Sequence, residues 1–183
     1  MARPAVIAFA IACAAGGARA QDLPDENCAG LAKLPSSLPR PEAFHVPPAT
    51  LAHLAKVKLA SKEAREFRTV LRVSARYGPN FAGSYTLAIW GCGSSCASLA
   101  VVDQRTGDVF FTPGLSFVAA HADEPFDTLT FHPDSRLLIV SGAPNEDESR
   151  QGVSAYLWTG RTFKLLKRLT YAQVCPATSS HPN

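Results

Sequence analysis

The stretch SYTLAIWGCGSSCASLAVV, residues 84–102, decides the fold. From Tyr85 to Ile89 apolar side chains occupy every second position, which is the period of a β-strand with one face on a core. Cys92 and Cys96 then stand four positions apart among glycines and serines, and SLAVV resumes the strand pattern. The stretch therefore predicts two strands joined by a sharp loop that a disulfide closes.

The same arrangement occurs a second time along the chain. TLAIWG, a loop, SLAVV, a turn at Thr106-Gly107 and DVFF align with LLIVSG, a loop, SAYLW, the turn TGR and FKLL, so that Gly91 corresponds to Gly142. LLIVSG is apolar on both faces and predicts a central strand. Each set is typical of three strands of a propeller blade, but two blades cannot close a ring. We expect an antiparallel β-meander of six to eight strands made of two propeller-blade-like three-stranded units.

One helix is predicted to pack on this sheet, which makes the fold class α+β. Ser61 can cap a helix over KEAREFRTVLRVSARY, and Gly78 and Pro79 are its stop signals. Apolar residues fall on one face, and the opposite face carries Lys62, Arg65, Arg68, Arg72 and Arg76. We interpret this basic face of an amphipathic helix as solvated, with an anionic polymer, a lipid or an acidic partner as the alternative.

The chain divides into four segments. Residues 1–20 are predicted to be a cleaved signal peptide, because an apolar run too short to span a bilayer is followed by small residues ending at Ala20. Residues 21–60 form an extended lead-in, with five prolines between positions 35 and 48, although residues 50–59 suit a helix or a strand equally. Residues 61–175 are the single globular domain, and 176–183 a disordered tail.

Export sets the compartment and the charge. No other stretch is long and apolar enough to be transmembrane, so the protein is expected to be periplasmic or secreted. The alternative is a lipid on Cys13, for which the preceding residues are a poor signal. Loss of Arg3 and Arg19 leaves 16 basic against 15 acidic residues, a net charge of about +1. Near neutrality and export both disfavour nucleic acid as a partner.

Four cysteines remain after removal of the signal, an even number for an oxidising compartment. We favour pairing Cys92 with Cys96 and Cys28 with Cys175, while crossed pairings such as Cys28–Cys92 stay open. Loop-closure entropy makes the long bridge worth roughly 5 kcal/mol and the short one roughly 2 kcal/mol.

The chain resembles a group of small exported bacterial proteins of unassigned function. The resemblance covers roughly residues 60–170 and rests on a Pro-Asn-Phe-Ala-Gly stretch, a Trp-Gly-Cys-Gly-x-x-Cys loop, a Thr-Gly hairpin and an Asp-Ser-Arg-Leu-Leu strand. The matching positions are Phe67, Pro79, Asn80 to Gly83, Tyr85, Trp90 to Gly93, Cys96, Asp103, Thr106, Gly107 and Asp134 to Leu137. It implies export and a single domain, and it brings no catalytic residue with it.

Reactive chemistry is weakly represented. A thiol–disulfide enzyme usually has two residues between its cysteines at a helix N-terminus, and zinc would need two further ligands with suitable spacing. His121 and His132 lie near Asp123, Glu124, Asp127 and Asp134 in the sequence, and this cluster could bind a metal or supply an acid–base pair. The cluster has no recognised ligand spacing, and the surrounding residues are those of polar loops. No cofactor and no metal are predicted.

These observations favour a non-enzymatic binding module of the bacterial envelope, although its enzyme status stays open. The partner would be an unknown envelope protein, including an enzyme or toxin that it inhibits, or a cell-wall glycan. The expected recognition surface comprises Trp90, Ser94, Ser95, Asn145, Glu146, Asp147, Glu148 and Trp158. The alternative is an envelope enzyme, either a redox protein using Cys92 and Cys96 or a hydrolase using the His121, His132 and Asp loops.

Overall fold

The computed structural model describes residues 35–120 and 127–174. These residues form eight strands: β1 Tyr85–Gly93, β2 Cys96–Asp103, β3 Val109–Phe110, β4 Phe117–Ala119, β5 Leu129–Phe131, β6 Leu137–Pro144, β7 Gly152–Trp158 and β8 Phe163–Leu169. The short helices among them are η2 Pro41–Phe44, α1 Lys62–Glu66, α2 Arg68–Arg76, η3 Glu148–Arg150 and α3 Tyr171–Val174. Every strand pair is antiparallel, so the predicted α+β class with a mainly antiparallel sheet is confirmed.

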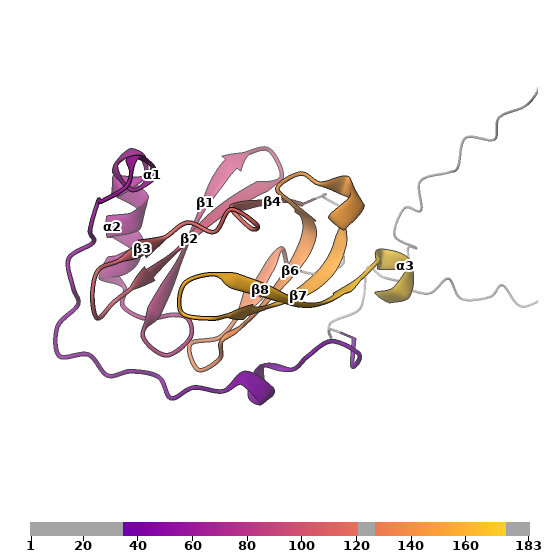
Figure 1. The fold of residues 1–183 in the computed structure, drawn as a ribbon, viewed down its shortest axis with the longest axis horizontal. Helices are drawn as coiled ribbons and strands as arrows, with labels where there is room; N and C mark the ends of the chain where they lie inside the picture. The colour runs from indigo at the N-terminus through magenta and orange to yellow at the C-terminus, as the bar shows by residue number, and fades with distance from the viewer. Residues whose placement is uncertain (1–34, 121–126, 175–183) are drawn as a thin grey trace, which may run out of the picture.

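The strands form one sheet in the order β1-β2-β4-β6-β7-β8, with β3 attached to β2 and β5 attached to β6. Strand β4 therefore joins two groups, β1-β2-β3 and β5-β6-β7-β8, which Figure 1 shows in pink and in orange to yellow. The sequence did not predict β4 and β5, because a strand of three residues is too short to show a periodic pattern.

The predicted hairpins are present. Strand β2 turns into β3 at Thr106-Gly107, and β7 turns into β8 through residues 159–162. Gly107 has a φ of +80°, and a Cβ atom there would collide with the backbone carbonyl of Lys56. The residue is glycine because the turn needs left-handed backbone and because the preceding chain crosses it closely.

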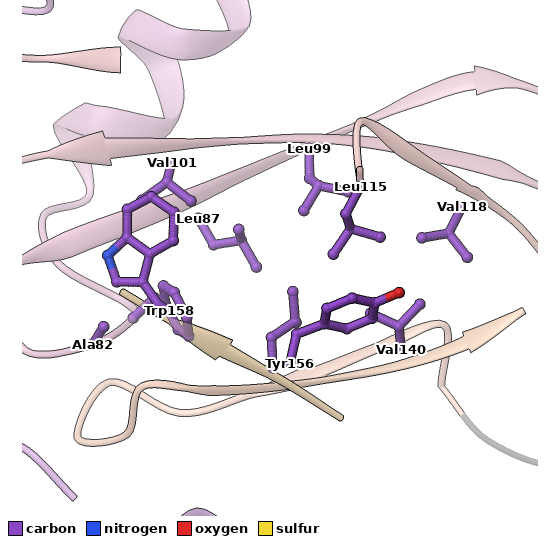
Figure 2. Close-up of a cluster of buried hydrophobic side chains, with 11 residues drawn as sticks. Ala82, Leu87, Leu99, Val101, Leu115, Val118, Val140, Tyr156 and Trp158 are labelled. Atoms are coloured by element: carbon purple, nitrogen blue, oxygen red, sulfur yellow. The ribbon is translucent and has the colours of Figure 1, made fainter. Parts of the chain in front are cut away.

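The main core lies between the two strand groups. Leu87, Leu99 and Val101 point down from β1 and β2 in Figure 2, toward Tyr156 and Trp158 of β7. Trp158 is the largest fully buried side chain among the described residues and contacts the rings of Tyr85, Phe81, Phe110 and Phe163. Because both groups contribute to this layer, each shields the apolar face of the other.

Each group is covered on its outer face as well. Leu71 and Ala75 of α2 pack against Ala88 and Ala100, the outward-facing neighbours of the main-core residues. On the opposite side, Leu38 of the lead-in and Tyr171 of α3 pack against β6 and β7, whose residues 137, 139, 153 and 155 alternate with the main-core positions. Strands β6 and β7 are consequently buried on both faces.

Three local features differ from the sequence-based expectations. The single helix is interrupted at Phe67, which has φ −91° and ψ 19°, and its ring packs against Trp90 and Phe111. The proline-rich lead-in, expected to exclude helix, contains the 3-10 turn η2, since Pro41 can occupy the first helical position. Residues 50–59 are neither helix nor strand; Ala55 and Lys58 donate backbone hydrogen bonds to Gln104 and Gly107.

Replacement of Gly142 should test how closely β4 and β6 approach. Gly142 has a φ of +129°, and a Cβ atom would collide with the backbone carbonyl of Ala119 at the end of β4. We expect Gly142→Ala to lower the free energy of unfolding by about 2 kcal/mol or more, measured by urea denaturation.

Gly114→Ala is the matched control, because no atom lies within 4 Å of its would-be Cβ. The control should stay within about 0.5 kcal/mol of the parent protein. Equal stability of the two variants would show that β4 does not lie this close to β6.

Candidate functional site

Cys92 and Cys96 form a disulfide at the tip of the β1–β2 hairpin, with their Cα atoms 5.2 Å apart. The predicted short bridge is confirmed. The strand register shifts between Gly91 and Gly93, so Cys92 is an extra residue that bulges from β1. We call residues 91–97 the disulfide hairpin; its tip is exposed from Gly91 to Ser95. Cys28 and Cys175 lie outside the described residues.

Strand β4 holds this hairpin beside the loop at residues 143–150. Ala119 pairs with Cys96 on one edge and with Ala143 on the other, and the backbone N–H of Ala120 donates to Ser95, 2.7 Å away. Adjacent strands lie about 4.8 Å apart, so the Cα atoms of Cys96 and Ala143 are about 10 Å apart. Two loops separated by some fifty residues in sequence thus share one end of the molecule.

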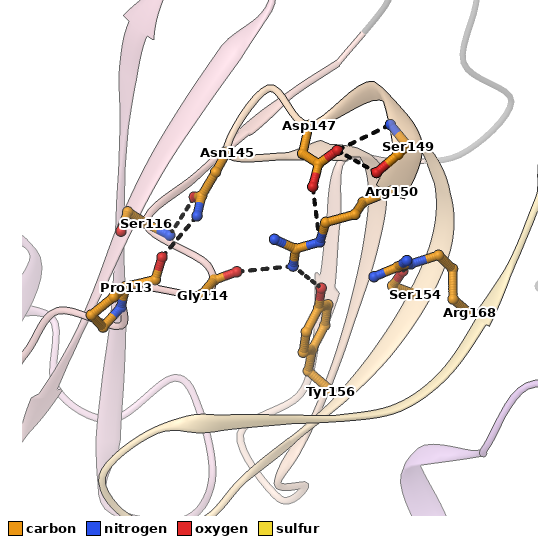
Figure 3. Close-up of polar contacts among 10 residues, drawn as sticks. All are labelled: Pro113, Gly114, Ser116, Asn145, Asp147, Ser149, Arg150, Ser154, Tyr156 and Arg168. Carbon is orange, nitrogen blue, oxygen red and sulfur yellow. Dashed lines mark hydrogen bonds and ion pairs between the residues drawn. The ribbon is translucent and has the colours of Figure 1, made fainter.

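Asn145 fixes the 143–150 loop to the segment before β4. Its Oδ1 accepts from the backbone N–H of Ser116 at 2.9 Å and of Phe117 at 3.4 Å, and its Nδ2 donates to the carbonyl of Pro113 at 2.8 Å. Figure 3 shows the side chain directed into this neighbouring loop. Asn145 has a φ of +56°, a left-handed conformation that asparagine tolerates better than most residues.

Asp147 and Arg150 close the other half of the loop. Asp147 caps η3 by accepting from the backbone N–H of Ser149, 3.1 Å away. The guanidinium of Arg150 lies inside the loop in Figure 3, where it donates to the carbonyl of Gly114 at 3.0 Å and to the hydroxyl of Tyr156 at 3.2 Å. Arg150 was not singled out from sequence, because a lone arginine in a polar loop carries no signal of its own.

The predicted recognition residues separate into two groups. Ser94, Ser95, Glu146 and Glu148 are exposed, and we call these four residues the loop surface. Asn145 and Asp147 lie in the same loop but use their side chains for internal hydrogen bonds. They shape the loop surface rather than offering free groups to a partner.

The expectation that Trp158 is exposed is wrong: its side chain is completely buried between the two strand groups. Side chains along β7 alternate between the two faces of the sheet, and both faces are covered by other parts of the protein. Neither set of side chains therefore faces water. Trp90 is half-buried, with its ring 4.8 Å from that of Phe67.

A second candidate region lies where the lead-in crosses the β5–β6 turn. Glu42, His45, His132 and Asp134 line an open cavity of about 400 Å³, and His45 Nδ1 lies 3.6 Å from Asp134 Oδ2. His132 and Asp134 were predicted to lie together, whereas no motif in the sequence pointed to His45. Asp127 is exposed and is not in the cavity lining, and His121, Asp123 and Glu124 lie outside the described residues.

A third depression, of about 410 Å³, is lined by Lys58, Asp108 and Arg161. Lys58 Nζ lies 2.9 Å from Asp108 Oδ1. This hydrogen bond, followed by one from Thr106, holds the pKa of the Asp108 carboxyl below its ordinary value of 3.8. The ion pair is open to solvent, so it contributes little to stability.

Within residues 35–120 and 127–174, no three His, Cys, Asp or Glu side chains gather closely enough to hold a metal ion. No helix of this described part is both long and apolar enough to cross a bilayer. Comparison with known proteins gave no match to a protein-family model, a curated protein or a solved structure.

Removal of the Asn145 side chain should loosen the loop surface. Asn145→Ala leaves two backbone N–H groups and one carbonyl without their partner, which should lower the free energy of unfolding by about 1–3 kcal/mol. Glu148→Ala, at an exposed position of the same loop, should change it by less than about 0.5 kcal/mol. Similar losses in the two variants, measured by chemical denaturation, would contradict a structural role for Asn145.

The disulfide should stabilise the protein without being required for folding. The bridge closes a loop of only a few residues, so we expect the double variant Cys92→Ser, Cys96→Ser to remain folded and to lose about 2 kcal/mol. Ser94→Ala, between the two cysteines, is the control. An unfolded double variant, judged by circular dichroism, would mean that the hairpin depends on the bridge.

Proposed function

We propose that the protein is an exported, non-enzymatic binding module of the bacterial envelope, which contacts another envelope protein through the loop surface. The observation that carries the proposal is the fastening of the disulfide hairpin and the 143–150 loop by β4. A loop that is already ordered loses little conformational entropy on binding, so this end of the molecule is suited to recognition.

The chemistry of the loop surface favours a partner with a basic patch. Glu146 and Glu148 are exposed, and among the described residues no cation lies within ion-pair distance of them. Ser94 and Ser95 offer hydroxyls on the disulfide hairpin at the same end of the molecule. Opposite charge on the partner would raise the association rate and suppress other partners. An envelope enzyme or toxin with such a patch could be inhibited by this contact.

Export is the second part of the proposal. The predicted signal at residues 1–20 and the disulfide between Cys92 and Cys96 both fit an oxidising compartment outside the cytoplasm. We place the mature protein in the periplasm or the medium, beginning near Gln21, with Cys28 and Cys175 as a second bridge.

The finer architecture is also proposed here. We infer that the β1-β2-β3 and β6-β7-β8 groups are propeller-blade-like repeats and that α1 and α2 together act as the predicted amphipathic helix. Exposed Arg72 and Arg76 opposite buried Leu71 and Ala75 support the second inference. We propose the same segments as before: a lead-in over residues 21–60, a single domain over residues 61–175 and a tail over residues 176–183.

The alternative is an envelope hydrolase. The cavity with His45, His132 and Asp134 supports it, since a histidine beside a carboxylate can act as a general base. We place it second because His45 and Asp134 are each more than half exposed, whereas catalytic pairs are usually held in a shielded site.

Site-specific photo-crosslinking in the exporting host tests the proposed function. A photoreactive amino acid at Ser94 and at Glu146, in separate variants, should capture the same envelope protein. The same probe at Arg72, exposed on α2 away from both loops, should not capture that protein.

Two results would contradict the proposal. One is the absence of any shared adduct from the two loop positions. The other is hydrolysis of an ester or peptide substrate that is lost in His45→Ala or His132→Ala, which would move the enzyme reading to first place.

A further inference from the structure

The outer edge of β1 carries backbone groups that the fold does not fully use. Strand β1 pairs with β2 on one edge only, and Leu99, opposite Ile89, donates its N–H away from β1 to Ser116. Residues 85, 87, 89 and 91 of β1 therefore direct their N–H and C=O groups to the free edge, because the two edges alternate along a strand.

The first half of this edge is closed by the chain itself. The N–H of Tyr85 donates to Phe81, and the carbonyl of Tyr85 accepts from both Asn80 and Phe81. At Leu87 the side-chain amide of Asn80 takes the place of a neighbouring strand: Oδ1 accepts from the Leu87 N–H at 2.7 Å, and Nδ2 donates to the Leu87 carbonyl at 3.2 Å. The Asn80 side chain is the last described group that hydrogen-bonds to the outer edge of β1.

Ile89 and Gly91 continue the same edge without a partner among the described residues. Ile89 is 37% exposed and Gly91 is exposed, so this part of the edge lies at the surface of the molecule. No atom lies within 4 Å of a Cβ built at Gly91, so the face of the sheet is also uncovered at this residue. Beyond it, the bulge at Cys92 ends the regular strand.

The opposite edge of the sheet is protected in a way that β1 is not. Strand β8 carries Lys164, Lys167 and Arg168, and Lys167 also donates to the carbonyl of Ser37 in the lead-in. Lysine on an edge strand is a common means of preventing another strand from pairing. Residues 89–93 of β1 carry no charge at all, although they form the exposed half of the other edge.

We propose that Ile89–Gly91 is a β-augmentation site, at which an extended segment of the partner protein adds a short strand to β1. The proposal rests on the proposed function and names how the partner is held beside the disulfide hairpin. Main-chain hydrogen bonds to Ile89 and Gly91 would bind the segment, and the exposed Ile89 side chain would select an apolar residue.

The geometry favours an isolated extended segment over a second copy of this chain. A second copy would bring its own β1 together with the Asn80–Phe81 segment that overlies the edge at residues 85–87. If Ile89 of one copy paired with Gly91 of the other, Asn80 at Leu87 would lie opposite the bulged end of the other strand. The pairing would then be limited to two outward-facing residues on each copy, which is too short for a stable two-stranded contact. A single peptide strand can pair with Ile89–Gly91 and then turn away from β1 before it reaches the Asn80 side chain at Leu87.

Selection from a displayed library of random ten-residue linear peptides, followed by affinity measurement with the synthetic winners, tests the site. Ile89→Pro removes one outward N–H without breaking a bond to β2, and proline is tolerated on edge strands where its nitrogen faces solvent. Ile89→Ala is the matched control, since it keeps the N–H and loses only the side chain.

We expect winners that bind Ile89→Ala somewhat more weakly than the parent protein, because the apolar contact is lost, and that bind Ile89→Pro at least fivefold more weakly than Ile89→Ala. N-methylation of alternate peptide residues should weaken binding as much, and the peptide should slow hydrogen exchange of the Ile89 and Gly91 amides. Circular dichroism of Ile89→Pro verifies its fold, and the exchange result does not depend on that variant.

Three outcomes would overturn the site. In the first, no selected peptide binds more weakly after N-methylation. In the second, the Ile89 and Gly91 amides exchange slowly before any peptide is added. In the third, their exchange slows when the protein concentration alone is raised. The last two would indicate that another part of the chain or a second copy occupies the edge. If photo-crosslinking from Ser94 and Glu146 succeeds while these tests fail, the binding function stands and only the augmentation site is lost.

Discussion

The structure depends on the pairing of β4, a strand of three residues with a neighbour on each edge. Its pairing with Cys96 to Ser98 of β2 and with Ala143 and Pro144 of β6 joins the two strand groups at the loop end. At the other end the groups are held by the core packing and by the backbone hydrogen bonds from Ala82 and Gly83 to Ser135 and Pro133. Gly142 permits the close approach, because any side chain there would meet the Ala119 carbonyl. The two loops at this end consequently have a fixed relative position, and the proposed recognition surface follows from it.

The same junction explains why so much of the sheet is buried. Once β4 connects the groups, Leu87 and Leu99 face Tyr156 and Trp158 across one core, and the helices and the lead-in cover the two outer faces. Among the described residues, the parts of the sheet that still reach solvent are its edge strands and the loops between strands. The structural features that point to binding, an unpaired stretch of β1 and two fastened loops, occur in those places.

The sequence predicted the elements that carry repeated signals and missed those that do not. Period-two patterns, the continuous apolar run LLIVSG and the Gly-containing turns located β1, β2, β3, β6, β7 and β8. Oxidising export together with spacing predicted the Cys92–Cys96 bridge. Nothing local distinguished β4, because its role depends on two strands far away in sequence. The exposure of Trp158 was predicted wrongly for the same reason: tertiary packing covers a face that the pattern alone leaves undecided. The internal bonds of Asn145 and the position of His45 beside Asp134 also required the three-dimensional structure.

Residue-resolved amide hydrogen exchange tests the central claim, that β4 fastens the two loops into one surface. The Ala120 and Asn145 amides, bonded to Ser95 and Phe117, should exchange as slowly as amides in the middle of β6, because opening either requires β4 to separate from its neighbours. Fast exchange at both positions, with β6 still protected, would show that the loops move independently and would contradict the account.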